Sequence, residues 1–461
     1  MEVAADVAVV GAGLSGLVCA ERLRQAGVSV VVLEAAEVVG GRAAAPSRGS
    51  GEHQERRECT AFLGPGHTRL AALAKELRVA VEPTFNEGRN LIEWRGRVRT
   101  YKGNVPSIST PILLSTSIAE KRLDRAARAV PVGRPWRAKR AHQWDTASFG
   151  DWLRSGHTLP GARDLLALGC GLVWGCHPDE VSLLHVLRTV GGAGSMGALF
   201  DTQGGAQESI LRGGAERLCA LLADRQADAL HLSTPVTEIR WSASRVQVRS
   251  PQMVAHARRV IVALPLQARA ALRLWPALAP ARAATGSPWR HGRRQVATVS
   301  YRTPFWRSRG LSGRALSDVG PASVVYDVSE PNTQSGTLLA YVTGRQAAAW
   351  EALPGRERRA QLLAGLGRLF GEAALRPTDV AAELPSPSAS AGPLTDGVPA
   401  YGSCAWLTAA PLSNPIGPLS WAGADTAESW PGYLEGAVRS GEARAAEAAR
   451  SLLGVPLAAT T

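Results

Sequence analysis

The stretch that decides the fold lies near the N-terminus, where residues 6–34 read DVAVVGAGLSGLVCAERLRQAGVSVVVLE. The apolar run at residues 7–10 predicts a buried parallel strand, because such strands are covered on both faces. A glycine loop at residues 11–16 follows, and the next residues have helical spacing as far as Gly27, a residue type common just after a helix. Residues 28–33 form a second apolar run. This order predicts a βαβ unit.

Each glycine of the loop has its own physical role in binding a dinucleotide. Gly11 permits the tight turn, Gly13 lets a pyrophosphate approach the backbone, and Gly16 allows the helix to pack closely on the strand. The free N–H groups at the start of the helix attract the phosphate charge. Glu34, at the end of the second strand, is expected to accept hydrogen bonds from a ribose diol and to repel a 2′-phosphate.

The next residues indicate which dinucleotide binds. Gly40, Gly41 and Arg42 follow shortly after Glu34. This sequence resembles the FAD-binding signature of the flavin amine oxidase superfamily, in which the arginine reaches the cofactor's phosphates or ribityl chain. The resemblance therefore implies FAD as the cofactor.

A segment near the other end of the chain carries the same resemblance. Residues 421–441 read WAGADTAESWPGYLEGAVRSG, which closely resembles the flavin-binding end of flavin-dependent monoamine oxidases. A strand is expected to end at Gly423, and a helix to begin near Gly432 with its N–H groups directed at the flavin. The alanine-rich residues 434–449 have the pattern of that helix.

Shorter matches extend the resemblance over nearly the whole chain. They include residues 100–104, residues 204–208, Pro304-Phe305-Trp306 and Val236, which matches a strand whose backbone meets the adenine. The implied fold is α/β, a Rossmann-like FAD-binding domain interleaved with an α+β substrate-binding domain. The FAD-binding domain is expected to comprise residues 1–75, 204–266 and 397–461, and the substrate domain residues 76–203 and 267–396.

The resemblance also implies which residues contact the cofactor and the substrate. The expected FAD contacts are Gly11, Gly13, Leu14, Ser15, Gly16, Glu34, Ala35, Gly41, Arg42, Val236, Gly423, Asp425, Tyr433 and Leu434. Tyr433 is expected to form one wall of an aromatic cage before the flavin, and Gln207 to line the pocket. The opposite ring position of the cage is occupied by Ala405, and Trp406 beside it is expected to supply the second ring.

In this family the substrate's C–H bond lies over the flavin N5 atom, and hydride transfer turns an amine into an imine that water hydrolyses. Oxygen then takes the electrons and becomes hydrogen peroxide. The cofactor performs the chemistry, so the protein chiefly orients the substrate and keeps its nitrogen neutral. This chemistry requires neither a metal nor a catalytic triad, and the sequence indicates neither.

Several positions depart from the family pattern close to the flavin. Val296 stands where the family usually has a lysine that is linked with the reaction of reduced flavin with oxygen. Cys59-Thr60 replaces two glycines, and Asp425 replaces the usual glutamate. Cys404 falls where some members attach FAD through a thioether and others keep a free thiol.

Three hypotheses about function therefore stay open. The first is an FAD-dependent oxidase that uses O2 and acts on an amine or an amino acid. The choice between these two substrates stays open, because the sequence has too many arginines to single out one that would bind a carboxylate. The second, favoured by Val296, is a dehydrogenase or desaturase of a biosynthetic pathway that uses another electron acceptor. The third, favoured by Cys59-Thr60 and Ala405, is a flavoprotein that has lost turnover and serves as a partner subunit.

The bulk composition narrows the remaining function classes. The 461 residues carry a net charge of +13, but arginine is spread along the whole chain, so we expect no nucleic-acid partner. The densest basic stretch, residues 121–140, predicts an amphipathic helix with a solvated face. No apolar run is long enough for a membrane span and no secretory signal is evident, which predicts a cytoplasmic protein. The six cysteines lie far apart, without metal-site spacing, and are expected to be mostly buried thiols.

Overall fold

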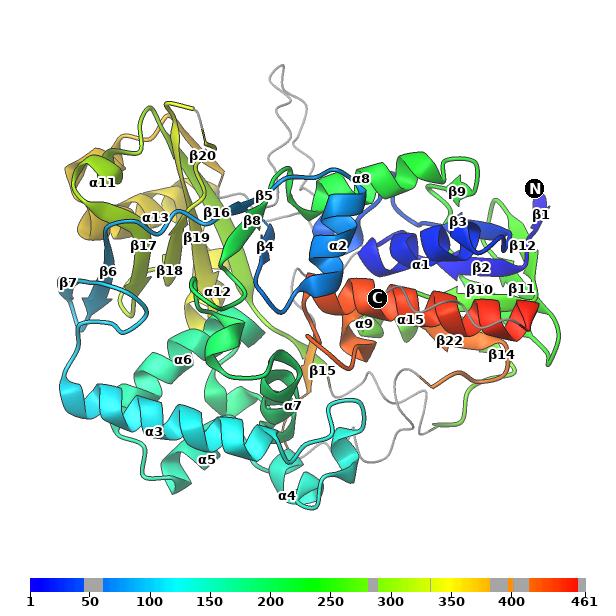
Figure 1. Ribbon diagram of the computed structural model, residues 1–461, viewed down its shortest axis with the longest axis horizontal. Helices are drawn as coiled ribbons and strands as arrows, with labels where there is room; N and C mark the ends of the chain where they lie inside the picture. Colours follow the sequence, from blue (N-terminus) through cyan, green and yellow to red (C-terminus); the bar gives the residue numbers. More distant parts are fainter. Residues whose placement is uncertain are drawn as a thin grey trace.

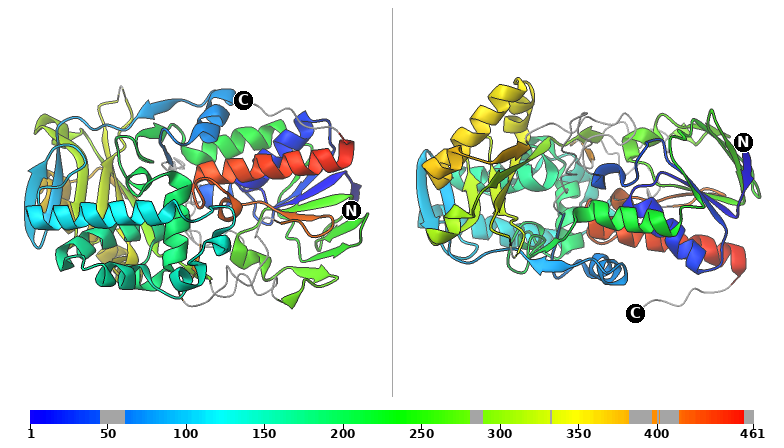
Figure 2. Two further views of the ribbon diagram at one scale, coloured as in Figure 1. Left: turned by 60° about the horizontal axis from the view of Figure 1, so that its bottom comes forward. Right: turned by 90° about the horizontal axis from the view of Figure 1, so that it is seen from above.

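The computed structural model describes residues 1–44, 61–280, 289–331, 333–381, 397–399, 401 and 414–454. These residues form two lobes that lie side by side (Figure 1). One lobe contains the first strands of the chain and its last helix, and the other contains a large mixed sheet with helices on both faces. Figure 2 shows the same division from two further directions.

The first lobe is built on a parallel sheet to which distant parts of the chain contribute. Its strand order is β22-β13-β2-β3-β9, and all four pairings are parallel. The strands are β2 Val7–Val10, β3 Val30–Leu33, β9 Leu230–His231, β13 Arg259–Val262 and β22 Leu419–Trp421. The predicted βαβ unit is confirmed, because α1 Leu14–Gln25 connects β2 to β3. The predicted α/β class is confirmed with it.

Helices cover one face of this parallel sheet, and a second sheet covers the other. The helices α1, α8 Gly214–Arg225 and α15 Leu434–Leu453 share one apolar core with β2 and β3. Helices α1 and α15 cross closely at Gly441, where any side chain would press against the Ser15 carbonyl oxygen. The second sheet has the order β1-β12-β11-β10-β14, and its inner face packs on the parallel sheet. Its strands are β1 Glu2–Ala4, β10 Glu238–Trp241, β11 Val246–Arg249, β12 Val254–Ala257 and β14 Arg273–Trp275.

The second lobe is built on a seven-stranded sheet of order β20-β16-β19-β18-β17-β6-β7. Its strands are β6 Arg89–Trp94, β7 Arg97–Tyr101, β16 Arg294–Tyr301, β17 Leu311–Ser317, β18 Val324–Asp327, β19 Gly336–Thr343 and β20 Asp379–Ala381. One face packs against α11 Phe305–Ser308, α12 Gly344–Glu351 and α13 Gly355–Phe370. The other face packs on α6 Pro160–Trp174 through Leu172.

A group of helices completes the second lobe below that sheet in Figure 1. They are α3 Thr110–Ala127, α4 Ala141–Asp145, α5 Phe149–Ser155, α6 and α7 Leu183–Ala193. Between the lobes lies a small sheet of order β4-β8-β5, made of β4 Ala61–Leu63, β5 Val81–Pro83 and β8 Ser209–Leu211. Helix α2 Thr68–Glu76 connects β4 to β5, and the short helix α9 Leu266–Arg269 follows β13. A two-stranded pair, β15 Trp289–His291 and β21 Gly397–Pro399, lies near α7. The predicted boundaries of the two interleaved domains stay a prediction.

Three local expectations differ from the structure. The helix predicted at residues 121–140 is wrong, because α3 begins at Thr110 and ends at Ala127. Pro111 lies in the first turn of that helix, and Pro131 and Gly133 lie in the irregular segment that follows it. Val236 lies in the loop between β9 and β10 and not in a strand. The last strand before Gly423 ends at Trp421.

The expectations for the C-terminal helix and for four of the cysteines are met. Helix α15 covers residues 434–449 and runs four residues further, to Leu453. Cys19, Cys170, Cys176 and Cys219 are buried free thiols, as expected. In the described ranges, no helix is long and apolar enough to cross a membrane. Within those same ranges, no group of three or more His, Cys, Asp or Glu side chains could hold a metal ion.

Candidate active site

The glycine loop has the geometry that a pyrophosphate needs. Gly11 has a φ of +104°, a conformation that side chains rarely adopt, and its N–H donates to the Leu33 carbonyl at 2.8 Å. A Cβ on Gly16 would overlap the Gly11 carbonyl oxygen, so this glycine permits the close contact between helix and loop. Gly13 has an ordinary φ of −70°, and the nearest heavy atom to a Cβ there is the Gly40 oxygen at 3.9 Å. The space beside Gly13 is therefore open.

Helix α1 begins at Leu14, directly beside this open space. The first N–H groups of a helix have no partner inside the helix, so those of Leu14 and Ser15 can bind an anion. The Ser15 hydroxyl is buried and has no hydrogen-bond partner among the described residues. A buried hydroxyl without a partner is costly, and a phosphate oxygen would satisfy it.

Glu34 is fixed at the end of β3 by backbone groups. Its carboxylate accepts hydrogen bonds from the Ala12 N–H at 2.6 Å and from the Ala36 N–H at 2.9 Å. Its own carbonyl accepts from the Thr234 N–H at 2.7 Å, and this contact draws the loop that carries Val236 toward Ala35 and Glu34. The residues expected around the adenine ribose thus lie together at one end of the parallel sheet.

The Gly40-Gly41-Arg42 segment joins the same loop. Gly40 pairs with Gly13, and its N–H donates to the Ala12 carbonyl at 2.8 Å. Gly40 and Gly41 both have positive φ values, +107° and +55°. Burial lowers the pKa of the Arg42 guanidinium, and the charge of nearby Asp425 opposes that fall. Arg42 therefore lies near the C-terminal segment, although the two are far apart in sequence.

The C-terminal segment is held by two arginines, neither of which was a sequence-predicted site residue. Arg269 forms an almost completely buried ion pair with Asp425, with Nη2 and Oδ2 3.1 Å apart. Arg188 of α7 donates to the Asp425 carbonyl at 3.0 Å and the Ala427 carbonyl at 2.9 Å. Burial lowers the pKa of Arg188 to about 10. These contacts fix the turn after Gly423, where a side chain would collide with Asp425.

Glu435, in the first turn of α15, is a further residue that the sequence reasoning missed. It has no exposed surface, and its carboxylate accepts from the backbone N–H groups of Arg69 at 3.1 Å and Leu70 at 2.7 Å. Arg439 also donates to it, at 2.6 Å. Glu435 therefore ties the start of α2 to the start of α15, next to Tyr433 and Leu434. A glutamate in the first turn of a predicted helix was the signal that could have found it.

Tyr433 and Gln207, predicted to face the substrate, converge on one backbone atom. The Tyr433 hydroxyl donates to the Leu199 carbonyl at 3.2 Å, and the Gln207 Nε2 group donates to the same oxygen at 3.4 Å. The other amide atom of Gln207, Oε1, is buried without a partner among the described residues. The Tyr433 ring packs edge-on against Trp430 at 5.2 Å. Burial raises the pKa of Tyr433 above its usual range, so its hydroxyl keeps its proton.

An apolar cluster extends from this pair across the large sheet. Its members from the sheet lie on the face that α6 covers, and the others come from α6, β4, β8 and the segment before β8. They are Leu172, Ile210, Val324, Tyr326, Val328 and Leu339, with Phe62, Phe200, Val296, Leu316 and Tyr341 partly buried against them. Phe62 and Tyr326 are tilted rings 5.2 Å apart. Val296 lies opposite Tyr341 on the neighbouring strand β19. The cluster is therefore apolar, and Val296 contributes no charge to it.

Five residues predicted near the flavin lie outside the described residues: Cys59, Thr60, Cys404, Ala405 and the predicted catalytic residue Trp406. The second wall of the expected aromatic cage and the thioether position therefore stay predictions.

Two carboxyl groups lie close together beside the apolar cluster. Burial raises the pKa of Glu120, on α3, from 4.5 to about 7, and the charges of Asp201 and Asp124 add to the rise. Burial also raises the pKa of Asp201 to about 6, although nearby Arg314 opposes the rise. Ionisation of these side chains at neutral pH lowers the stability of the folded protein, because burial removes water from the charged carboxylate.

This cost makes the stability of a Glu120→Gln variant depend on pH. The folded pKa of Glu120 lies above the unfolded value, so ionisation favours unfolding as pH rises through the window from about 4.5 to about 7. The unfolding free energy of Glu120→Gln minus that of the wild type should therefore be about 2 kcal/mol larger at pH 8 than at pH 5. Urea unfolding at both pH values measures this difference. Exposed Glu87→Gln is the control and should show no such change; equal behaviour of the two variants contradicts the prediction.

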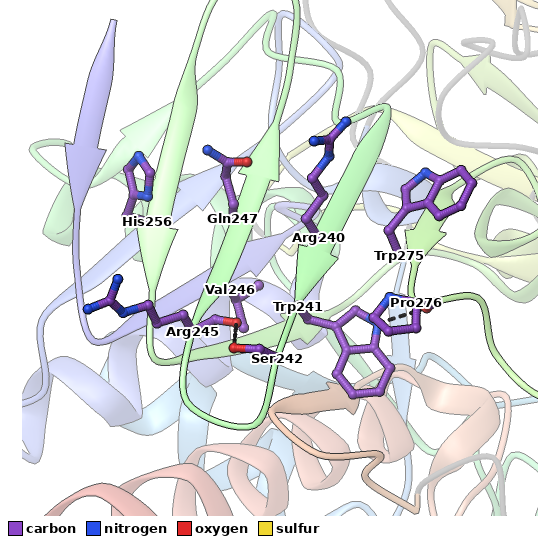
Figure 3. A pocket seen from close by; sticks show the side chains of 9 residues that line it. All are labelled: Arg240, Trp241, Ser242, Arg245, Val246, Gln247, His256, Trp275 and Pro276. Carbon is purple, nitrogen blue, oxygen red and sulfur yellow. Dashed lines mark hydrogen bonds between the residues drawn. The ribbon is translucent and has the colours of Figure 1, made fainter.

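A groove of about 860 Å³ lies far from these residues, on the outer face and edge of the second sheet. Figure 3 shows Arg240, Gln247 and His256 projecting side by side from neighbouring strands. Trp241 lies at one end, where its indole N–H donates to the Pro276 carbonyl at 3.0 Å. None of the residues predicted to bind FAD or substrate lines this groove.

Comparison with protein families and with known sequences gives matches that extend over nearly the whole chain. Residues 14–449 match the family model described as flavin-containing amine oxidoreductase. The flavin-containing monoamine oxidase AofH of Mycobacterium tuberculosis is 38% identical over 459 residues, covering 97% of both chains. The L-amino acid dehydrogenase of Synechocystis is 28% identical, covering 98% of this chain and 95% of that one.

Solved structures agree with the sequence comparison. Wild-type putrescine oxidase bound to putrescine is 27% identical and superposes with a TM-score of 0.90, covering 97% of this chain and 99% of that one. Cyclohexylamine oxidase from Brevibacterium oxydans is 28% identical with a TM-score of 0.88, at the same coverage. The similarity in each case extends over both lobes.

Proposed function

The chain belongs to the family of flavin-containing amine oxidoreductases, and from this premise we propose that it oxidises a carbon–nitrogen bond of an amine or amino acid, with O2 as electron acceptor. It is an FAD-dependent oxidoreductase, as the sequence predicted. The observation that carries the proposal is the convergence of Tyr433 and Gln207 on the Leu199 carbonyl. It leaves Gln207 Oε1 as an unused acceptor beside an aromatic ring.

The residues present fit FAD. The open space beside Gly13, the unpartnered Ser15 hydroxyl and the start of α1 suit a pyrophosphate. Glu34 suits the adenine ribose, and Arg42 with Asp425 suits the phosphate or ribityl part. We assign Ala35, Val236 and Leu434 to the walls of the same site. Bound FAD supplies the acceptor for a hydride from the substrate carbon.

The chain's own residues bind and orient the amine. Gln207 Oε1 can accept one N–H of the substrate nitrogen, which leaves the nitrogen lone pair free. Tyr433 limits the position of the substrate from the side of α15, and the apolar cluster keeps water away from the substrate. Loss of a hydride from carbon and a proton from nitrogen gives an imine. Water hydrolyses the imine to a carbonyl compound and ammonia, and O2 takes up two electrons and two protons to become hydrogen peroxide.

A specific observation favours a second candidate, a dehydrogenase with another electron acceptor. Val296 lies in the apolar cluster beside Phe62 and Tyr341, so no lysine ammonium lies at that position. If a lysine there is needed for fast reaction with oxygen, reduced enzyme should accumulate in air. This candidate keeps the same substrate chemistry and differs only in where the electrons go.

An anaerobic reduction experiment tests both candidates. The purified protein should be yellow. Its visible flavin absorbance should disappear when the protein is mixed anaerobically with a suitable amine or amino acid, and should return when air is admitted. The proposed oxidase should release one peroxide per flavin reoxidised. Slow recovery in air with fast recovery by a dye or quinone supports the dehydrogenase. A yellow protein that no member of the panel reduces overturns the proposal.

A further inference from the structure

Strand β16 places an arginine on the same face as Val296. Successive side chains of a strand point to opposite faces, so Arg294 and Val296 share one face. The Arg294 guanidinium carbon lies 5.8 Å from the centre of the Tyr341 ring, and its Nη1 group donates to the Leu172 carbonyl at 2.9 Å. Leu172, Tyr341 and Val296 all belong to the apolar cluster. Arg294 therefore directs its charge into the substrate side of the site.

The position of Arg294 relative to Tyr433 supports this placement. The charge of Arg294 opposes the rise that burial causes in the pKa of Tyr433, so the two groups lie close enough to interact. The same charge acts on the pKa of Arg42, the residue that fits the phosphate or ribityl part of FAD. Arg294 is thus close enough to one expected cofactor residue and one expected substrate residue to act on the pKa of each.

Within the described ranges, Arg294 forms no ion pair, and its Nε group is buried without a hydrogen-bond partner. Two other arginines of this region form ion pairs. Arg269 pairs with Asp425, and Arg293 pairs with Glu351 at 2.9 Å. Arg314 also has a buried Nε without a partner, but its Nη1 group donates to Thr202 at 2.9 Å and Asn104 at 3.2 Å, and its charge opposes the rise in the pKa of Asp201. A partly buried guanidinium with an unused N–H requires an anion or acceptor for its stability.

The proposed site therefore contains two unused groups of complementary kind. Arg294 Nε is a cationic donor, and Gln207 Oε1 is a neutral acceptor. A carboxylate suits the first and an amine N–H suits the second. A simple alkylamine would satisfy only Gln207 and, when protonated, would be repelled by the unneutralised arginine.

We propose that Arg294 binds a carboxylate of the substrate, so that the enzyme acts on amines that carry a carboxylate, that is, on amino acids. This inference rests on the proposed function and names its substrate class. Arg294 is then a residue that determines specificity, and the guanidinium takes part in no proton or electron transfer.

Matched substrate pairs test the proposal in the FAD-loaded enzyme. The pairs are L-leucine with 3-methylbutylamine, L-phenylalanine with 2-phenylethylamine, and 4-aminobutanoate with butylamine. Stopped-flow reduction of the flavin without oxygen gives the efficiency for each compound. For at least one pair the amino acid should be at least about 100-fold more efficient than its amine, as expected when a site built for a polar group rejects an analogue that lacks it.

The variant Arg294→Gln should abolish this preference, chiefly by raising the substrate concentration needed for half-maximal reduction. Arg294→Lys, which keeps the charge but loses the planar pair of donors, should retain part of it. Arg293→Gln is the matched control, because this neighbouring arginine is exposed and pairs with Glu351. Amines that work as well as their amino acids, or a preference that survives Arg294→Gln, overturn the proposal.

A binding measurement separates this inference from the proposed function. The inert carboxylates 3-phenylpropanoate and 4-methylpentanoate should perturb the flavin spectrum of the wild type and of Arg293→Gln. Their dissociation constants should rise at least about 30-fold in Arg294→Gln, as expected for loss of a charge-assisted contact. If no compound reduces the flavin, the proposed function fails while this titration still decides the role of Arg294. Unchanged carboxylate binding in Arg294→Gln overturns the inference whatever the activity.

Discussion

A valine at position 13 should give a folded protein that does not retain FAD. Gly13 has backbone angles, φ −70° and ψ 169°, that any residue can adopt, so the polypeptide itself does not require a glycine there. A Cβ would meet nothing closer than the Gly40 oxygen at 3.9 Å. The space that the valine side chain fills is the space through which a pyrophosphate approaches the start of α1. The dissociation constant for FAD should therefore rise by at least about 100-fold.

The experiment measures two quantities for each variant. They are the flavin absorbance of the purified protein and the melting temperature of the protein after removal of FAD. Gly13→Val should melt within a few degrees of the wild-type apoprotein yet be colourless. Gly355→Val is the control, because it makes the same chemical change at the exposed start of α13 and should stay yellow. Gly16→Ala should behave differently, since its Cβ overlaps the Gly11 carbonyl oxygen and the fold itself must shift. Wild-type FAD affinity in Gly13→Val would falsify the assignment of this loop.

The parts of the molecule that the sequence predicted well are those whose signals are local. Strand β2, the glycine loop, α1 and β3 follow one another without interruption, and each has a distinct spacing of apolar residues. Helix α15 was predicted for the same reason, from one continuous alanine-rich run. The helix predicted at residues 121–140 was wrong because Pro131, Gly133 and Pro135 disfavour a helix after Ala127, whereas Pro111 fits the first turn of α3.

Residues that act across the fold could not be found in this way. Arg188 holds the carbonyls of Asp425 and Ala427, and no local pattern distinguishes it from the many exposed arginines. The same holds for Arg294, because its partners Leu172 and Tyr341 lie on α6 and β19. The sequence therefore left amines and amino acids as equal alternatives, and only the three-dimensional arrangement favours one of them.

Glu435→Gln should lower the stability of the protein far more than the same change at Glu442, on the same helix. Glu435 is fully buried and accepts from the Arg69 and Leu70 N–H groups and from Arg439. An amide at this position turns one acceptor into a donor, which leaves a buried N–H of α2 without a partner and removes the charge that Arg439 faces. The expected loss is about 3 kcal/mol in unfolding free energy.

Glu442 provides the comparison because its chemistry is similar but its surroundings are not. It pairs with Arg69 at 2.7 Å and Arg22 at 3.4 Å, with 16% of its side chain exposed, so Glu442→Gln should cost less than about 1 kcal/mol. Thermal unfolding followed by flavin fluorescence measures both variants. Because Glu435 adjoins Tyr433 and Leu434, its variant should also release FAD at a lower temperature. Equal decreases in stability and in the temperature of FAD release in the two variants would show that the hydrogen bonds between Glu435 and α2 do not hold the flavin end of the site.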